Sequence, residues 1–154
     1  MRLRPHHVLD IVSDIGKGVR FEPHPYGHSL HTVAEAILAS TDIKAEWVVG
    51  SDAICQGCKH LRPNGSCGDL MGPVDHRRSK QAYNDAHDGR LLGFLGFPAG
   101  TRMSVREYLV RVLEKMPEIA KVCSHPGESP AERLAGLEKG LAKLGIGLAS
   151  KHPA

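Results

Sequence analysis

Apolar side chains recur at helical spacing along much of the chain, with polar residues between them. Residues 29–39 carry apolar side chains at i, i+3, i+4, i+7 and i+8, which predicts an amphipathic helix. A second apolar stripe spans residues 104–116, where Ser104 and Glu107 have the spacing of a capping box at a helix start. Both stretches therefore predict helices that bury one face.

Helical spacing also appears near both ends of the chain. The apolar residues within positions 8–15 predict a first helix that ends at Gly16. Ser129 followed by Pro130 is typical of a helix start, and Gly145 suits the cap at the other end of that helix.

The middle of the chain is less strongly patterned. Residues 75–93 favour a helix without a clear apolar stripe, and residues 46–49 favour a short strand that Gly50 closes. Residues 51–73 are rich in Cys, Gly and Pro and predict an ordered loop. We therefore expect a mainly α, single compact helical domain with one short strand or hairpin and a cysteine-bearing metal loop.

Composition places the chain among globular proteins. Its 154 residues fit one domain, to which we assign residues 1–147, with residues 148–154 as a frayed C-terminal tail. The net charge of +3 is too small to indicate nucleic-acid binding. The first residues lack the apolar run of a signal peptide, and no stretch has the length of a membrane span. We therefore expect a cytoplasmic protein with no nucleic-acid or membrane partner.

The strongest chemical signal comes from the four cysteines of the chain. Cys55, Cys58 and Cys67 follow a C-x2-C-x8-C pattern, and Cys123 lies much further along. A C-x2-C turn brings two thiolates to one centre, and Gly57 permits the tight backbone of that turn. Because the cytoplasm keeps thiols reduced, metal binding is favoured over two disulfides. The pattern predicts one metal site on the four thiolates.

The spacing leaves the identity of the metal open. Four thiolates complete either a tetrahedral zinc site or a [4Fe–4S] cluster. Structural zinc usually pairs two close C-x2-C or H-x3-H turns, whereas the third and fourth cysteines here are isolated, which favours a cluster. The alternative is that Cys55 and Cys58 are free surface thiols and that Cys123 is a small buried hydrophobic residue.

Two adjacent histidines stand at the start of the first predicted helix, directly after Arg4 and Pro5. Neighbouring side chains on a helix point in different directions, so His6 and His7 are not expected to bind one ion together. One of them is a candidate ligand or proton donor, and Asp10 lies on the shared helical face, where its carboxylate can orient an imidazole. The alternative is one packed and one solvated histidine.

A second histidine cluster follows the first predicted helix. It comprises His24, His28 and His31, with no cysteine or carboxylate pattern beside them. We therefore interpret these three histidines as loop residues and expect no second metal there.

The two motifs together give the chain a resemblance to a known family. With R-P-H-H-V-L at residues 4–9 and D-A-I-C-Q-G-C at residues 52–58, the sequence resembles a bacterial and archaeal family of domains of unknown function that is described as iron–sulfur binding. Its members open with a pattern such as R-x-H-H-L-L-C, continue to a G-x-G-Y segment and carry D-D-I-C-x-x-C near the middle. The match covers roughly residues 2–123, and the residues to which it points are His6, His7, Gly16, Gly18, Asp52, Cys55, Cys58, Cys67 and Cys123.

Two departures from the family pattern bear on the ligands. The first cysteine of the family corresponds to Asp10 here, and the C-terminal C-x2-C of the family is reduced to Cys123. If the first cysteine is a ligand in relatives, either Asp10 replaces it as an oxygen ligand or that ligand is missing. The resemblance implies a cluster and specifies no reaction.

These observations lead to three functional hypotheses. The first is a small cytoplasmic protein with one [4Fe–4S] cluster on the four cysteines, which acts in electron transfer, in redox sensing or as an accessory to a redox or enzyme partner. The second is a structural zinc site in a helical adaptor domain. The third is an enzyme in which three cysteines hold the metal and an open coordination position faces His6, His7 or Asp10.

Overall fold

In the part of the chain that the structure describes, three very short strands lie between helices. The computed structural model describes residues 1–71, 78–123 and 126–147. In chain order, the elements are β1 (Arg2–Leu3), α1 (Pro5–Lys17), α2 (Leu30–Ala39), β2 (Lys44–Trp47), the 3₁₀ turn η1 (Ala53–Cys55), α3 (Lys80–Leu95), β3 (Arg102–Ser104), α4 (Val105–Glu114), α5 (Ile119–Val122) and α6 (Pro130–Lys143). The predicted mainly helical fold with a small strand component is confirmed.

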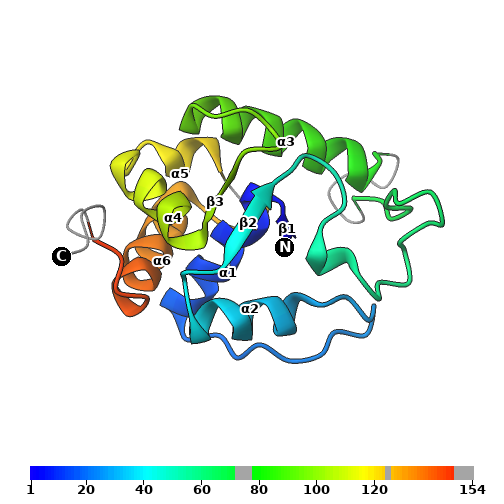
Figure 1. Cartoon of the computed structure of the whole chain (residues 1–154), viewed down its shortest axis with the longest axis horizontal. Helices are drawn as coiled ribbons and strands as arrows, with labels where there is room; N and C mark the ends of the chain where they lie inside the picture. Colours follow the sequence, from blue (N-terminus) through cyan, green and yellow to red (C-terminus); the bar gives the residue numbers. More distant parts are fainter. Residues whose placement is uncertain (72–77, 124–125, 148–154) are drawn as a thin grey trace.

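The strands form one sheet with β2 in the middle, and Figure 1 shows this sheet between α3 on one side and α2 on the other. β1 runs parallel to β2, whereas β3 runs antiparallel to it, with Lys44 opposite Ser104. Trp47 of β2 is buried and stacks on Tyr108 of α4, with 3.8 Å between the ring centroids. The Tyr108 hydroxyl donates to the Pro5 carbonyl at 2.9 Å, so the sheet and α4 together fix the start of α1.

Local sequence signals set the ends of several helices. The predicted capping box is present, because the Ser104 hydroxyl accepts from the Glu107 amide at 3.0 Å and the Glu107 carboxylate accepts from the Ser104 amide at 2.7 Å. α6 begins at Pro130 after a side-chain cap from Ser129, as predicted. Gly145 follows the end of α6 with a φ of 71°, a conformation that favours glycine.

The first helix does not end at Gly16 as predicted, and the reason is its contact with α6. α1 continues one residue further and is capped by Gly18, with a φ of 72°. Gly16 faces α6, where a Cβ atom would overlap the carbonyl of Gly136. A Cβ atom on Gly140 would likewise overlap the carbonyl of Val12. These glycines allow the two helix backbones to touch, so a residue that usually ends helices serves here in packing.

The weak apolar pattern of α3 has a structural explanation. The helix begins at Lys80, and residues 75–77 of the predicted helix lie outside the described residues, as does the predicted tail at residues 148–154. α3 buries His87 and Asp88 beside the leucines near its C-terminal end. Two polar positions therefore interrupt the stripe that an ordinary core helix would show.

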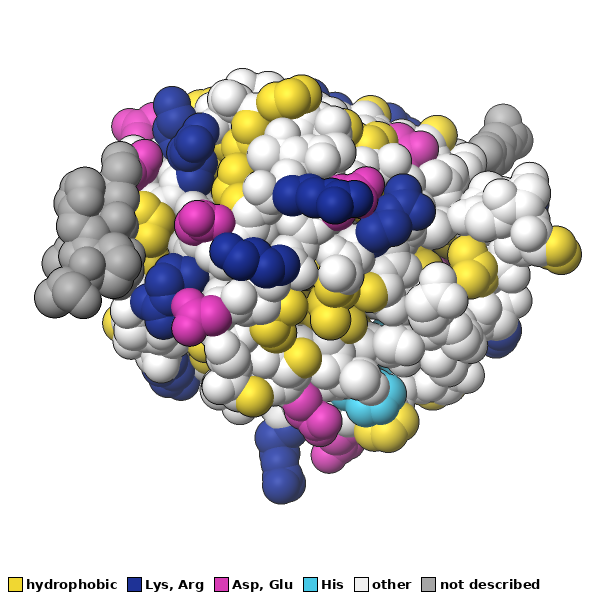
Figure 2. Space-filling view, viewed as in Figure 1, with side chains coloured by type: hydrophobic (Ala, Val, Ile, Leu, Met, Phe, Trp, Pro, Cys, Tyr) yellow, Lys and Arg dark blue, Asp and Glu magenta, His cyan; other side chains and the backbone are white. Residues whose placement is uncertain are grey.

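The described surface carries charges of both signs. Figure 2 shows Lys and Arg side chains interspersed with Asp and Glu side chains on one face, with hydrophobic side chains between them. This distribution fits the small net charge of +3. Among the described residues, no helix combines the length and the apolar run that a membrane crossing requires.

Candidate functional site

A buried arginine ties the start of α1 to α3. Arg4 lies between β1 and α1 with only 2% of its surface exposed. Its guanidinium donates to Asp88 at 2.8 Å and to Asp85 at 2.8 Å, and both carboxylates come from α3. A buried charge is tolerated when it is paired and hydrogen-bonded in this way.

His6 shares the Asp88 carboxylate with Arg4. One oxygen of Asp88 accepts from the His6 amide at 2.9 Å and lies 2.8 Å from the His6 Nδ1 atom. The amide is one of the unpaired donors at a helix start, so Asp88 also caps α1. Burial would raise the pKa of Asp88, but the hydrogen bonds from His6 and Arg4 lower it below the ordinary value. Burial would lower the pKa of His6, but the adjoining Asp88 carboxylate raises it.

His7 turns to a different carboxylate, which belongs to the cysteine-bearing segment. Its Nδ1 atom lies 3.0 Å from one oxygen of Asp52, and the same oxygen accepts from the Arg4 amide at 2.7 Å. The other oxygen accepts from the Ile54 amide at 3.1 Å and lies 3.5 Å from the Cys55 thiol. Burial would raise the pKa of Asp52, but the hydrogen bond from His7 lowers it. Asp52 thus joins the start of α1 to the first cysteine.

These contacts define a connected group of buried or half-buried residues, which we call the polar network: Arg4, His6, His7, Asp52, Asp85 and Asp88. The rings of His6 and His7 do not diverge as expected, because their centroids lie 4.5 Å apart, but each ring pairs with its own carboxylate. In a neutral imidazole, an Nδ1 that faces a carboxylate carries the proton, and the lone pair is then on Nε2. Carboxylate–histidine pairs of this kind orient metal ligands and catalytic bases.

Asp10 does not orient either imidazole by a hydrogen bond, although its spacing from His6 and His7 suggested it. Its carboxylate accepts from Arg133 of α6 at 2.7 Å, and Arg133 also pairs with Glu128 at 2.6 Å. Burial would raise the pKa of Asp10, but the charges of His6 and Arg133 lower it. Asp10 therefore links α1 to α6.

The fourth cysteine lies in the core. Cys123 follows α5, is fully buried and belongs to the central hydrophobic cluster. Burial raises the pKa of its thiol, and the charge of Asp10 adds to the effect. A neutral, enclosed thiol behaves as a small hydrophobic group and is a poor nucleophile or ligand.

The other three cysteines share one irregular segment, residues 52–70, which we call the cysteine loop. All three side chains are half-buried. The Cys58 amide donates to the Cys55 carbonyl at 3.1 Å, which forms the predicted tight turn, and Gly57 within it has a φ of 83°. Cys67 returns beside this turn, because it pairs with Leu61 in an antiparallel bridge.

The far end of the cysteine loop is also tied to the polar network. The Cys67 amide donates to the side-chain oxygen of Gln81 at 2.9 Å, and the Gln81 amide group donates to Asp85 at 3.0 Å. Asp85 is the second partner of Arg4. Asp52 and Gln81 therefore anchor the cysteine loop to the polar network at both ends.

The second histidine cluster packs against the C-x2-C turn, which the sequence analysis did not foresee. Gly27 and Gly57 face each other so closely that a Cβ on either would lie 2.6 Å from the other's carbonyl oxygen. The Lys59 amide donates to the Tyr26 carbonyl at 2.7 Å, and the Ser29 amide donates to the Ile54 carbonyl at 2.8 Å. Residues 24–29 and the turn thus form one backbone-bonded unit.

The imidazoles of this second cluster differ from those of α1. His24 and His28 lie in the loop, as predicted, with stacked rings whose centroids are 4.4 Å apart, whereas His31 lies within α2. The Nδ1 atom of His24 accepts from the Tyr26 amide at 3.0 Å, and Nδ1 of His28 accepts from the Leu30 amide at 3.4 Å. An Nδ1 that accepts leaves the proton on Nε2. Burial lowers the pKa of His28, and the neighbouring His24 lowers it further.

In the part of the chain that the structure describes, no three His, Cys, Asp or Glu side chains form a group that could hold a metal ion. The three thiols of the cysteine loop share a segment but are not gathered around one point. The structure thus brings the loop and the polar network together and leaves Cys123 in the core.

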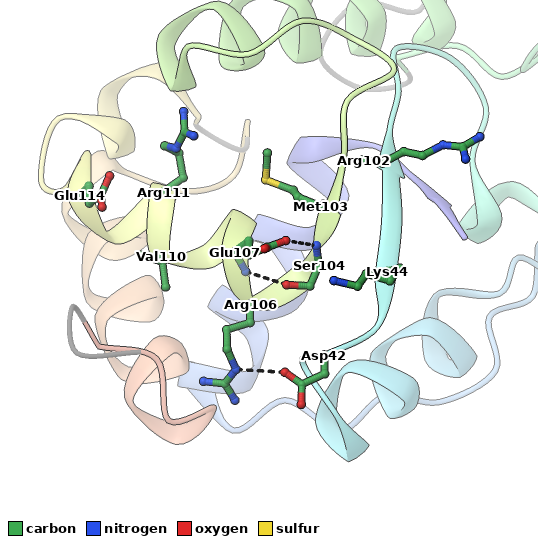
Figure 3. Close-up of a pocket in the computed structure, with 10 residues that line it drawn as sticks. All are labelled: Asp42, Lys44, Arg102, Met103, Ser104, Arg106, Glu107, Val110, Arg111 and Glu114. Atoms are coloured by element: carbon green, nitrogen blue, oxygen red, sulfur yellow. Dashed lines mark hydrogen bonds and ion pairs between the residues drawn. The ribbon is translucent and has the colours of Figure 1, made fainter. Parts of the chain in front are cut away.

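A surface pocket lies apart from these groups, along β3 and α4 (Figure 3). Its volume is about 660 Å³, and its lining residues are Asp42, Lys44, Arg102, Met103, Ser104, Arg106, Glu107, Val110, Arg111 and Glu114. Glu107 bonds to Ser104 and Arg106 bonds to Asp42, so polar groups of the pocket satisfy one another. The lining has charges of both signs and includes no residue of the cysteine loop or the polar network.

Comparisons with protein-family models, with curated proteins and with solved structures found no match to this chain. The resemblance inferred from the two motifs therefore stays a prediction. The site is interpreted from its own geometry.

Sequence reasoning missed the acidic half of the polar network on α3. Asp85 and Asp88 are spaced i, i+3 and thus share a helix face, and His87 lies between them. The signal that could have revealed them is the gap in the apolar stripe of α3, because the buried face there has to continue from Leu91 and Leu95 through polar side chains. Arg4 lies inside the N-terminal motif, but no role was predicted for it from the sequence.

Proposed function

We propose that this protein binds a metal centre through the thiols of Cys55, Cys58 and Cys67, with an iron–sulfur cluster as the favoured group. The observation that carries the proposal is the placement of three half-buried cysteines on one loop, which is tied to the polar network through Asp52 at one end and through Gln81 at the other. Such anchoring is what a metal site needs from the residues around its ligands.

The donor chemistry of the loop fits a soft metal or cluster. Thiolates favour zinc, copper(I) and iron–sulfur groups over the hard cations that prefer oxygen ligands. The thiols are not gathered in the structure, so binding would draw the side chains of the loop together, and metal binding and local folding would be coupled. A bound cluster would supply one-electron redox chemistry, whose potential responds to hydrogen bonds and burial around the sulfurs.

The residues of the chain have distinct roles in this proposal. Cys55, Cys58 and Cys67 hold the centre, and Asp52 fixes the start of the loop against α1. Cys123 is not a ligand, because a thiol enclosed in the hydrophobic core has neither the ionisation nor the access that ligation requires. The proposal therefore keeps three of the four cysteines named from the sequence.

The test is metal and sulfide analysis of protein purified without oxygen, together with its visible absorption before and after reduction. We expect iron and sulfide in the wild type, with loss of both in Cys55→Ser, Cys58→Ser and Cys67→Ser. The matched control is Cys123→Ala, which should keep its iron. Protein free of iron and sulfide would refute the cluster, and one zinc per chain in its place would support the structural-zinc alternative. A folded Cys123→Ala variant without metal would restore the four-cysteine site.

A further inference from the structure

We infer that His7 supplies the fourth ligand of the centre, through its Nε2 atom. This inference rests on the proposed function, because it presupposes that the cysteine loop holds a metal group. It assigns the coordination position that three loop cysteines leave open, and it separates the roles of the two adjacent histidines of α1.

A shared carboxylate is the first argument. The Asp52 carboxylate lies 3.0 Å from Nδ1 of His7 through one oxygen and 3.5 Å from the Cys55 sulfur through the other. Asp52 is itself 2% exposed and is held by the Arg4 amide. One fixed carboxylate therefore positions both the imidazole and the first thiol of the loop.

The tautomer is the second argument. Because Nδ1 of His7 faces a carboxylate, the neutral ring carries its proton there and offers the Nε2 lone pair. None of the described residues forms a hydrogen bond to this Nε2 atom. The His7 side chain is 18% exposed, so the ring is not fully enclosed. The ring thus has the orientation that carboxylate-held metal ligands adopt.

Other candidate donors fail at least one of these criteria. His60 lies within the cysteine loop, but the Asp69 carboxylate lies 3.9 Å from its Nε2 atom and does not hold its Nδ1 atom. His28 packs beside the C-x2-C turn, but its Nδ1 accepts from a backbone amide, which leaves the proton on Nε2. His6 has the required tautomer, but its carboxylate, Asp88, belongs to α3 instead of the cysteine loop. Asp10 is engaged by Arg133 of α6. His7 combines the right tautomer with a direct link to the loop.

A nitrogen ligand would change the properties of the centre. Replacement of thiolate by imidazole removes negative charge around the iron and raises the reduction potential. If the bound metal is zinc, three cysteines and one histidine form a common structural set.

The experiment uses the full chain reconstituted without oxygen with ferrous iron and sulfide, with histidine labelled with ¹⁵N. Pulsed electron paramagnetic resonance of the reduced cluster should detect coupling to a histidine nitrogen. His7→Gln should lose that coupling and part of its iron, whereas the control His28→Gln should keep both. His7→Cys should bind iron without the coupling and have a lower reduction potential, which keeps the test valid if His7→Gln folds poorly.

The outcomes separate the two proposals. A wild-type cluster without nitrogen coupling, or with coupling that persists in His7→Cys, would overturn the role of His7 and leave the cysteine loop as the binding site. A wild-type protein that takes up neither an iron–sulfur group nor zinc would overturn both. Circular dichroism of each variant checks that metal loss does not come from unfolding.

Discussion

The substitution Asp88→Asn tests how much the Asp88 carboxylate of the polar network contributes to the free energy of unfolding. The Asp88 carboxylate is fully buried and accepts from the Arg4 guanidinium, the His6 amide and the His6 ring. An amide of the same shape keeps an acceptor for the His6 amide but removes the negative charge. Asp85 cannot compensate, because its side chain is 36% exposed and already pairs with Arg4.

The expected cost follows from the loss of the buried carboxylate of the two that pair with Arg4, which leaves the buried guanidinium with Asp85 alone. Removal of one partner from a buried ion pair destabilises a protein by about 3–5 kcal/mol, and the retained acceptor places Asp88→Asn near about 3 kcal/mol. With a urea dependence of about 2 kcal/mol per molar, the midpoint of unfolding should fall by about 1.5 M. Arg4→Met removes the guanidinium whose buried partner is lost, so the double variant should be more stable than the sum of the two single effects predicts.

The assay is equilibrium urea unfolding followed by circular dichroism at pH 7. The matched control is Asp42→Asn, which breaks the pair with Arg106 at an aspartate whose side chain is 80% exposed and should cost less than about 1 kcal/mol. If Asp88→Asn costs no more than this control, or if the double variant shows simple additivity, the account of a coupled buried network is wrong.

Three further predictions concern packing, pH and the cysteine loop. Gly140→Ala should destabilise the fold by about 1–3 kcal/mol in urea unfolding, because its Cβ would collide with α1. Gly93→Ala on the open face of α3 should be neutral or stabilising. Equal effects of the two substitutions would contradict the backbone contact between α1 and α6. Burial and the charge of His6 lower the pKa of His87 from 6.5 to about 4, so the stability of the fold should decrease as the pH drops through this window. His87→Gln should remove about 3 kcal/mol of that loss between pH 7 and pH 4. Parallel pH profiles of the wild type and this variant would refute the effect of His87. Gly57→Ala should lower iron uptake more than Gly65→Ala, because both glycines have a positive φ but only Gly57 faces another backbone segment, at Gly27. Equal iron uptake by the two variants would show that the contact between Gly27 and Gly57 does not support the metal site.

The elements with local sequence signals were predictable, and those that depend on tertiary contacts were not. α4 carries its own start signal in Ser104 and Glu107, and α2 has a regular apolar stripe. β1 and β3 contain only two and three residues, so no alternation can develop, and they are strands only because β2 offers hydrogen bonds. Gly16 has a low helix propensity, but contact with α6 outweighs it.

The same distinction applies to the candidate site. The cysteine spacing indicated the cysteine loop directly, and the N-terminal motif indicated His6 and His7. Their carboxylate partners were misassigned, because helical spacing favours the nearby Asp10, whereas the fold brings Asp88 and Asp52 from distant segments. The spacing of residues along a helix shows which side chains share a face of that helix. It does not show which carboxylates from other elements pack against that face.

The backbone contact between residues 24–29 and the C-x2-C turn has a consequence for dynamics. The amides of Ser29 and Lys59 are bonded across this contact, so neither segment can open without releasing the other. The two segments should act as one cooperative opening unit, whose amide protons exchange with solvent at a shared rate. A change at the thiols would then alter the exchange rate of the Ser29 amide proton, which lies nearly thirty residues earlier in the chain.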